Sequence, residues 1–328
     1  MVKIFVETPS RLHFTLIDLN GELGRVDGGI GVTLEKPGWK IEVLPSKKFI
    51  VEGLGKELAK IFAEKFFMYY GLKPDIKIKI LDSIPQHVGL GSGTQLALAI
   101  ATSLTKIFGI KTTIRELAKI MERGGTSGIG VAAFEGGGFI LDGGHSFGEK
   151  KQKQSFLPSH FSNAPPAPIL ARYSLPENWM FVVVIPNIQR SIHGLEEFKI
   201  FKTYCPISTD EVNKLSRIIL MKILPSIVEK NIVDFGKALT EIQNIGFKKI
   251  EIQLQKSIVK ELIGWMVENG AYGAGMSSFG PVVYGLVDGT HKAEKLKDKI
   301  NQFLDEKNIG GKVFSTKVNN KGAIVKEF

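Results

Sequence analysis

The clearest chemical signal in the sequence is a glycine-rich run at residues 84–95, Ile-Pro-Gln-His-Val-Gly-Leu-Gly-Ser-Gly-Thr-Gln, which lies between an expected strand and an expected helix. A helix N-terminus has unpaired N–H groups and the positive end of the helix dipole, so it favours phosphate oxygens. Glycines allow close approach of the backbone to such an anion, although they could equally serve only a tight turn. The Walker ending Gly-Lys-Ser/Thr is absent. We predict a phosphate site made by Pro85, His87, Gly89, Leu90, Gly91, Ser92, Gly93 and Thr94.

A second segment, near the N-terminus, contains residue types that bind anions or transfer protons. The run Thr-Pro-Ser-Arg-Leu-His-Phe includes Arg11 and His13, and Asp18 and Arg25 follow it. An arginine can hold a carboxylate or phosphate through two hydrogen bonds, and a carboxylate can stabilise a developing cation. A structural alternative stays open for each residue. Asp18 precedes Asn-Gly, a hairpin signal, Arg25 could form a surface ion pair, and His13 could be a satisfied core residue.

A third segment, from Gly270 to Gly280, is again rich in glycine and serine and includes Gly275 and Ser277. Two more histidines are candidate site residues. His87, inside the first glycine-rich run, could reach a phosphate or cap the turn, and His193 could line a cleft between domains.

Composition limits the class of protein. The chain has 328 residues, one cysteine and a net charge of +10. Its length suggests two domains, and the single cysteine excludes an internal disulfide framework. The positive charge favours anionic partners, but the lysines are dispersed without interleaved aromatics, so we expect neither nucleic acid nor membrane as a partner. No apolar run approaches the ~20 residues of a membrane span, and we expect a cytoplasmic protein.

Periodicity predicts the elements that position these segments. The first 145 residues alternate strand and helix signals, with a helix after the glycine-rich run and a capping box at Thr113–Glu116. Five prolines between Lys150 and Pro176 predict a linker or long crossing loop. We therefore expect domains at residues 1–160 and 161–328. In the second, a buried strand at 181–185 is followed by helices at 209–229, 232–242 and 257–268, a strand segment at 270–287, a helix at 293–304 and strands at 313–318.

The three segments together resemble the motifs of the GHMP superfamily of small-molecule kinases. Pro85–Gly93 matches the motif Pro-x-x-x-Gly-Leu-Gly-Ser-Ser/Gly at each position. The resemblance implies an α+β fold of two domains, a ribosomal-protein-like α/β N-terminal domain and a ferredoxin-like C-terminal domain. In several GHMP kinases a glutamate before a Ser-Gly-x-Asp loop binds Mg²⁺, and the Asp is the catalytic base. Here Glu122 matches the glutamate, so it and Ser92 are the expected Mg²⁺ ligands, but Gly130 replaces the base.

A closer resemblance is to the archaeal β-ribofuranosylaminobenzene 5′-phosphate synthase family, through residues 10–21, 24–32 and 124–130. It implies a decarboxylating phosphoribosyltransferase of methanopterin biosynthesis that condenses 4-aminobenzoate or 4-hydroxybenzoate with phosphoribosyl pyrophosphate, releasing CO₂ and pyrophosphate. It also implies Mg²⁺ and a homodimer. Under this hypothesis Asp18 stabilises the ribosyl centre and Arg25 clamps an anion, with His13 as a further catalytic candidate. Substrate-binding candidates beyond the glycine-rich run are Arg11, Gly275 and Ser277.

Two other functions remain as alternatives. One is an ATP-dependent GHMP small-molecule kinase, because the same loop serves kinases. The other is a non-catalytic RNA-binding protein, which the basic charge and the ribosomal-protein-like domain would suit. The usual phosphoribosyltransferase signature, two acidic residues ending an apolar strand, is absent, so phosphoribosyl binding depends on the resemblance.

Overall fold

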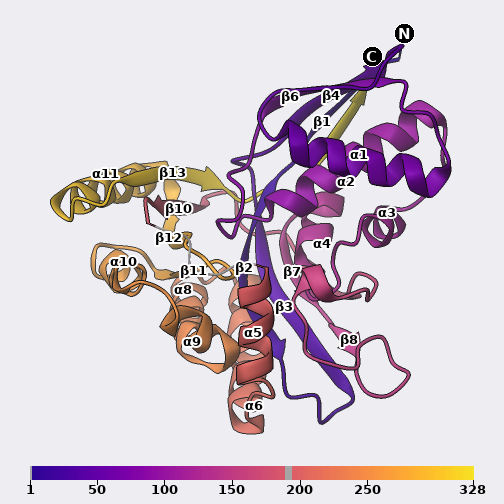
Figure 1. Cartoon of the computed structure of the whole chain (residues 1–328). Helices are drawn as coiled ribbons and strands as arrows, with labels where there is room; N and C mark the ends of the chain where they lie inside the picture. Colours follow the sequence, from indigo (N-terminus) through magenta and orange to yellow (C-terminus); the bar gives the residue numbers. More distant parts are fainter. Residues whose placement is uncertain (1, 189–193) are drawn as a thin grey trace.

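A computed structural model describes residues 2–188 and 194–328, and Figure 1 shows three sheets with helices packed against them. The first sheet has the strand order β14-β1-β4-β6-β5 and joins the two ends of the chain, because β14 pairs antiparallel with β1. Its strands are β1 (Ile4–Glu7), β4 (Lys40–Pro45), β5 (Ile50–Glu52), β6 (Ile76–Asp82) and β14 (Ile324–Glu327).

Helices of the N-terminal half cover this sheet. Helix α2 packs against β1 and β4 and against α1, so the glycine-rich run that precedes α2 is held against the sheet. The capping box at Thr113 is present, with both of its hydrogen bonds, at the start of α3. The helices are α1 (Lys56–Tyr70), α2 (Ser92–Phe108), α3 (Ile114–Ile120) and α4 (Ile129–Gly136).

A long hairpin forms the second sheet and runs between the two halves of the molecule. Its strands β2 (Ser10–Asp18) and β3 (Arg25–Leu34) pair antiparallel, and the sheet has the order β2-β3-β7-β9, with β8 beside β3. The others are β7 (Phe139–Asp142), β8 (His145–Ser146) and β9 (Ile169–Tyr173). In Figure 1 the hairpin passes beside α5 and α6 on one side and β7 on the other.

The third sheet has the order β11-β12-β10-β13, all antiparallel. Numbered by sequence this is 2-3-1-4, with helices between the first and second strands and between the third and fourth. This β-α-β-β-α-β arrangement is ferredoxin-like, as expected. Its strands are β10 (Trp179–Pro186), β11 (Gly273–Met276), β12 (Val283–Asp288) and β13 (Gly311–Lys317).

The helical connections of this half differ from the expectation in three places. The stretch 209–229 is broken by a π-helical turn, and two helices before and after it, α5 and α9, were not predicted. The elements here are η1 (Ser159–Phe161), α5 (Leu195–Tyr204), α6 (Thr209–Ile218), η2 (Ile219–Ile223), α7 (Leu224–Val228), α8 (Ile232–Glu241), η3 (Ile242–Asn244), α9 (Gly246–Gln253), α10 (Ser257–Glu268) and α11 (Gly289–Glu306).

The expected domain boundary between residues 160 and 161 stays a prediction. The proline-rich stretch is mostly irregular, but β9 within it still pairs with β7 in the hairpin sheet. Strand β10 then starts the ferredoxin-like sheet at Trp179. The chain therefore passes between these sheets over residues 174–178.

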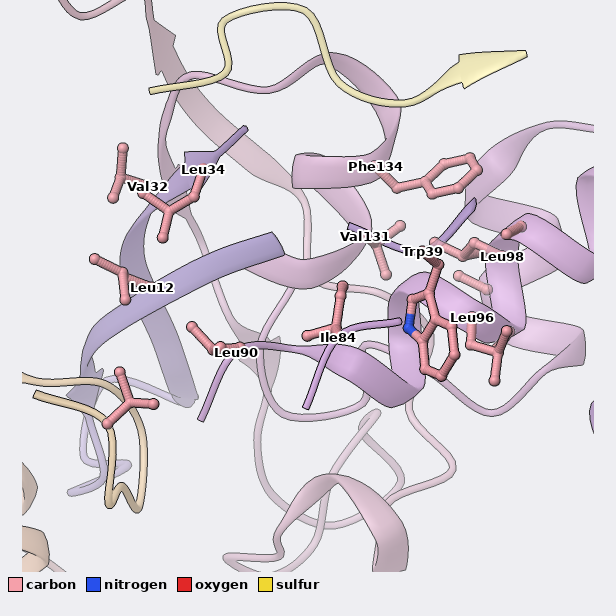
Figure 2. Packing of buried hydrophobic residues seen from close by; sticks show 14 of the residues in the cluster. Leu12, Val32, Leu34, Trp39, Ile84, Leu90, Leu96, Leu98, Val131 and Phe134 are labelled. Carbon is pink, nitrogen blue, oxygen red and sulfur yellow. The ribbon is translucent and has the colours of Figure 1, made fainter. Parts of the chain in front are cut away.

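The glycine-rich run is anchored by its apolar side chains, which point into the core while its backbone stays accessible. Ile84, Val88 and Leu90 are each at most 2% exposed. Figure 2 shows Ile84 and Leu90 among side chains from β2, β3, α2 and α4. The buried indole of Trp39 lies beside them, and its Nε1 donates a hydrogen bond of 3.0 Å to the Ser92 carbonyl oxygen in the first turn of α2. This contact positions the start of the helix.

Trp39→Phe should lower the free energy of unfolding by about 1–3 kcal/mol, because it removes a buried hydrogen bond and leaves a cavity. Chemical denaturation measures the change. Trp265→Phe is the matched control, since this half-buried ring packs on Phe303 and its indole N–H has no bonding partner among the described residues. Equal denaturation midpoints for the two variants would contradict the anchoring role of Trp39.

Candidate active site

A cavity of about 270 Å³ lies where the glycine-rich loop, β2 and the C-terminal half meet. The loop and β2 of the N-terminal half line it together with α5, α9 and the turn after β11 from the C-terminal half. Segments far apart in the sequence therefore share one space. Its lining includes Arg11, His13, Leu16, Leu58, Phe62, Gln86, His87, Gly89, Leu90, Gly91, Ser92, Gly93, Thr94, Arg123, Thr126, Ser127, Pro158, Ser159, Glu197, Phe201, Glu251, Ser278, Phe279 and Gly280.

The carbonyl oxygen of Gly89 joins the three segments singled out in the sequence. It accepts hydrogen bonds from Arg11 Nη1 at 2.5 Å and from Ser277 Oγ at 2.6 Å. Ser277 Oγ also accepts from the His13 backbone N–H at 3.0 Å. Gly89 has φ +97°, and a Cβ there would lie 2.3 Å from the Ser277 carbonyl oxygen. Only glycine fits this junction.

The N-terminus of α2 opens towards the cavity. Gly91 is its N-cap, with φ +79° and no side-chain cap, so the first N–H groups of the helix lack an intrahelical partner. Ser92, Gly93 and Thr94 form this first turn and all line the cavity. No atom lies within 4 Å of the position that a Cβ of Gly93 would take. The arrangement suits an anion, as predicted from the sequence.

Two buried basic side chains of β2 stand beside the loop. Burial lowers the pKa of Arg11 to about 10, so the guanidinium keeps its charge at neutral pH. His13 is 6% exposed, and neither ring nitrogen has a hydrogen-bond partner among the described residues. Burial, followed by the charges of Arg11 and Lys248, holds the pKa of His13 well below its usual value. His13 is therefore a neutral imidazole able to donate or accept a hydrogen bond.

The C-terminal half contributes carboxyl groups to the cavity that the sequence analysis missed. Glu251 of α9 is 3% exposed and pairs with Lys248, whose Nζ donates 3.0 Å to the Ser278 carbonyl. Burial, and secondarily the charge of Glu251, raises the pKa of Glu197 in α5 to about 7. The capping Gly194 and the acidic first turn of α5 were weak signals of a helix, but no local pattern indicated that these carboxyls would face the loop.

A buried ionic cluster supports the segment at Thr126 and Ser127. The carboxylate of Asp27 bonds His145 Nδ1 at 2.6 Å and Lys153 Nζ at 2.9 Å, and Lys153 reaches Thr126 Oγ1 at 3.5 Å. Lys153 and Asp27 are nearly fully buried. Lys153 thus connects the hairpin to the cavity wall.

A second buried carboxyl, Asp142, bonds the same wall segment. It accepts from the Gly128 N–H at 2.9 Å and from Ser127 Oγ at 3.3 Å. Burial raises the pKa of Asp142 to about 7. His13 Nε2, Asp142 Oδ2 and Ser127 Oγ all lie within 3.4 Å of the Cβ position that Gly29 lacks. These contacts fix the base of the cavity.

Most of the predicted phosphate-binding residues lie together. The cavity lining includes Arg11, His13, His87, Gly89, Leu90 and residues 91–94. Pro85 and Ser277 are not among the lining residues, and Ser277 bonds the Gly89 carbonyl oxygen of the loop. Gly275 is in β11, where a Cβ would lie 2.6 Å from Gln243 and Tyr284, so its role here is close packing. His193 is outside the described residues.

Asp18 and Arg25 are not among the residues that line the cavity. The Asp18 carboxylate accepts from the backbone N–H groups of Asn20 and Gly21 at 2.7 and 3.2 Å, which closes the hairpin turn. Arg25 is exposed, and its Nε donates to the Gly143 carbonyl. Asp18 follows the cavity-lining Leu16 by two residues, roughly 6–7 Å along the strand. Their roles in turnover stay predictions.

The residues expected to hold Mg²⁺ do not fit that role. Ser92 is 5% exposed and its Oγ donates to the Ile84 carbonyl at 3.0 Å. Glu122 is paired with Lys65 and lies outside the cavity lining. No group of three or more His, Cys, Asp or Glu residues within the described chain could hold a metal ion. Ser92 and Glu122 are therefore not placed to hold one metal ion in the cavity.

Over residues 2–188 and 194–328, no helix combines the length and the apolar character that crossing a membrane requires.

Lys153→Met should lower the free energy of unfolding by about 3–5 kcal/mol, because it leaves the buried Asp27 carboxylate without its ammonium partner. Thermal or chemical denaturation measures the loss. Lys151→Met, an exposed change in the same loop, should stay within about 0.5 kcal/mol of the wild type. The double variant Asp27→Asn/Lys153→Met should regain part of the stability, and a Lys153→Met variant as stable as the wild type would contradict this account.

The fold is shared with known GHMP proteins. The family model "GHMP kinases N terminal domain" matches residues 56–138, and "GHMP kinases C terminal" matches residues 223–306. Among solved structures, a homoserine kinase from Cytophaga hutchinsonii superposes with a TM-score of 0.70 over 99% of this chain and 97% of its own, at 16% identity. At that identity the likeness concerns the fold alone.

Two archaeal relatives match the chain along nearly its whole length. β-Ribofuranosylphenol 5′-phosphate synthase of Methanothermobacter thermautotrophicus is 43% identical over 99% of both chains. The enzyme of the same name from Methanocaldococcus jannaschii is 42% identical over 97% of this chain and 99% of its own. The chain therefore belongs to the β-ribofuranosylphenol 5′-phosphate synthase family, within the GHMP superfamily.

Proposed function

We propose that this protein condenses a 4-substituted benzoate with phosphoribosyl pyrophosphate and releases CO₂ and pyrophosphate, as a step of methanopterin biosynthesis. The names of its relatives support a ribosyl 5′-phosphate product. The observation that carries the proposal is the lining of the cavity, which combines an open helix N-terminus and Arg11 with the rings of Phe201 and Phe279. A phosphorylated donor and an aromatic acceptor need such a pair of surfaces.

The acceptor that the relatives' names favour is 4-hydroxybenzoate. The expectation left open whether the acceptor has a 4-amino or a 4-hydroxy group. Both relatives are named for a phenol product, which follows from loss of CO₂ from a hydroxybenzoate. We therefore place 4-hydroxybenzoate first.

The donor fits the loop side of the cavity. Its diphosphate would accept hydrogen bonds from the N–H groups of the first turn of α2, beside the Arg11 guanidinium. Departure of pyrophosphate leaves positive charge on the ribosyl C1′, which a carboxylate stabilises. Within the cavity lining, the carboxyl groups are those of Glu197 and Glu251. The neutral His13 can hydrogen-bond a ribose hydroxyl.

A GHMP kinase remains the runner-up, because the same loop would bind a nucleotide triphosphate. Gly130, at the position of the kinase base, has no side chain, and its Cβ position lies 3.3 Å from Thr94. This start of α4 therefore supplies no proton acceptor. RNA binding without catalysis stays the lowest alternative, because it draws only on the basic charge and the ribosomal-protein-like domain. Mg²⁺, a homodimer and a cytoplasmic location stay predictions of the family resemblance.

With both substrates present, the protein should release CO₂ and pyrophosphate in equal amounts, and neither substrate alone should give either product. Coupled pyrophosphate detection and ¹⁴C-carboxyl release measure this. Phosphoribosyl pyrophosphate at 100-fold over its dissociation constant should stabilise the fold by about 2.7 kcal/mol, whereas ATP with Mg²⁺ should not. Stabilisation by ATP together with phosphorylation of a small molecule would favour the kinase instead.

Gly93→Ala should weaken pyrophosphate binding at least tenfold, because its methyl group would project into the open space beside the first turn of α2. The free energy of unfolding should stay the same or rise by up to about 1 kcal/mol, since alanine favours helix. Calorimetric titration measures the affinity. Gly264→Ala, in an exposed turn of α10 with equally open space, should show the stability gain with unchanged affinity. Unchanged affinity in Gly93→Ala would contradict the site.

A further inference from the structure

One face of α5 presents a carboxyl group and an aromatic ring to the cavity. Glu197 and Phe201 are four residues apart, so they lie one above the other on the helix, and both line the cavity. Phe201 packs on Phe247 with ring centroids 4.7 Å apart, and Phe279 lies 5.9 Å from Phe247 and 6.5 Å from Phe201. The three rings pack on one another and form an apolar surface beside Glu197.

The two carboxyl groups of this wall differ in their partners. Glu251 is paired with Lys248, which is fully buried. Glu197 makes no hydrogen bond or ion pair with any residue in the described part of the chain. The other titratable groups that line the cavity are Arg11, His13, His87 and Arg123, from β2, the loop and the segment after α3.

The protonation state of Glu197 suits reversible proton transfer. Burial, and then the charge of Glu251, raises the pKa of Glu197 to about 7, so near neutrality it is partly ionised. Efficient general bases have pKa values close to the working pH. Glu197 can therefore accept a proton and later return it.

The condensation of a hydroxybenzoate needs such a group. As the ring carbon that bears the carboxylate forms its bond to C1′ of the ribose, the bond from C1′ to pyrophosphate breaks. Electron density flows from the 4-hydroxyl oxygen through the ring, and this oxygen releases its proton. The bond to CO₂ then breaks, its electron pair restores the aromatic ring, and the oxygen takes the proton back. A 4-amino group donates its lone pair without losing a proton.

We propose that Glu197 is the general base that takes the proton from the 4-hydroxyl of the acceptor and returns it, while the acceptor ring packs against Phe201 and Phe279. This inference rests on the proposed function and assigns within it the residue that selects the hydroxy acceptor. The four-residue spacing on α5 places the base beside the ring of Phe201, and both line the cavity.

The test is Glu197→Gln, which keeps the shape of the side chain but cannot accept a proton. With 4-hydroxybenzoate we expect kcat to fall by about 100-fold or more, the usual contribution of a general base. With 4-aminobenzoate the fall should be less than tenfold. Wild-type turnover of 4-hydroxybenzoate should rise as the pH passes about 7, where Glu197 ionises, and this rise should be absent in the variant. Glu196→Gln, exposed on the same helical turn, is the control and should match the wild type.

The outcomes separate this inference from the function on which it rests. If the wild type releases CO₂ and pyrophosphate but Glu197→Gln loses nothing, or loses the same factor with both acceptors, the role of Glu197 is overturned and the function stands. If the wild type releases neither product with either acceptor, the function itself fails. Circular dichroism and the denaturation midpoint show whether the variant is folded. We expect it to be folded, because Glu197 makes no hydrogen bond or ion pair with a described residue.

Discussion

The carbonyl oxygen of Gly89 is the point on which the geometry of the site depends. It receives the Arg11 guanidinium and the Ser277 hydroxyl, residues separated from it by 78 and 188 positions in the chain. A side chain at residue 89 would collide with the Ser277 backbone. The loop, the N-terminal strand and the C-terminal turn therefore hold one another, and the N-terminus of α2 opens on the cavity at a defined position.

Burial then divides the cavity electrostatically. Beside the loop, Arg11 keeps its positive charge and His13 is held neutral, which favours an anion there. In the C-terminal half, Glu251 is neutralised by Lys248, whereas Glu197 has a raised pKa and no described partner. One cavity thus combines an anion-binding helix N-terminus with the aromatic rings of Phe201 and Phe279.

The same scaffold serves phosphate transfer in the kinases whose fold this protein shares. We propose that here too the helix N-terminus and its glycines bind phosphate oxygens, as the resemblance of Pro85–Gly93 to the kinase motif implies. We expect the type of reaction to depend on the side chains that surround the rest of the cavity. Here Gly130 occupies the position of the kinase base and has no side chain. Helices α5 and α9 of the other half contribute carboxyl groups to the cavity lining.

The sequence by itself identified the glycine-rich loop from local signals and the family from its motifs, and the ferredoxin-like half followed from that resemblance. Glycines before a helix, the match at residues 85–93 and the alternation of strands and helices can each be read within a short window. Only the tertiary structure decided which acids face the loop. Asp18 closes its own turn, whereas Glu197 and Glu251, more than 100 residues beyond the loop and with no motif around them, line the cavity. Packing between distant segments sets the position and pKa of a side chain, and no local pattern encodes it.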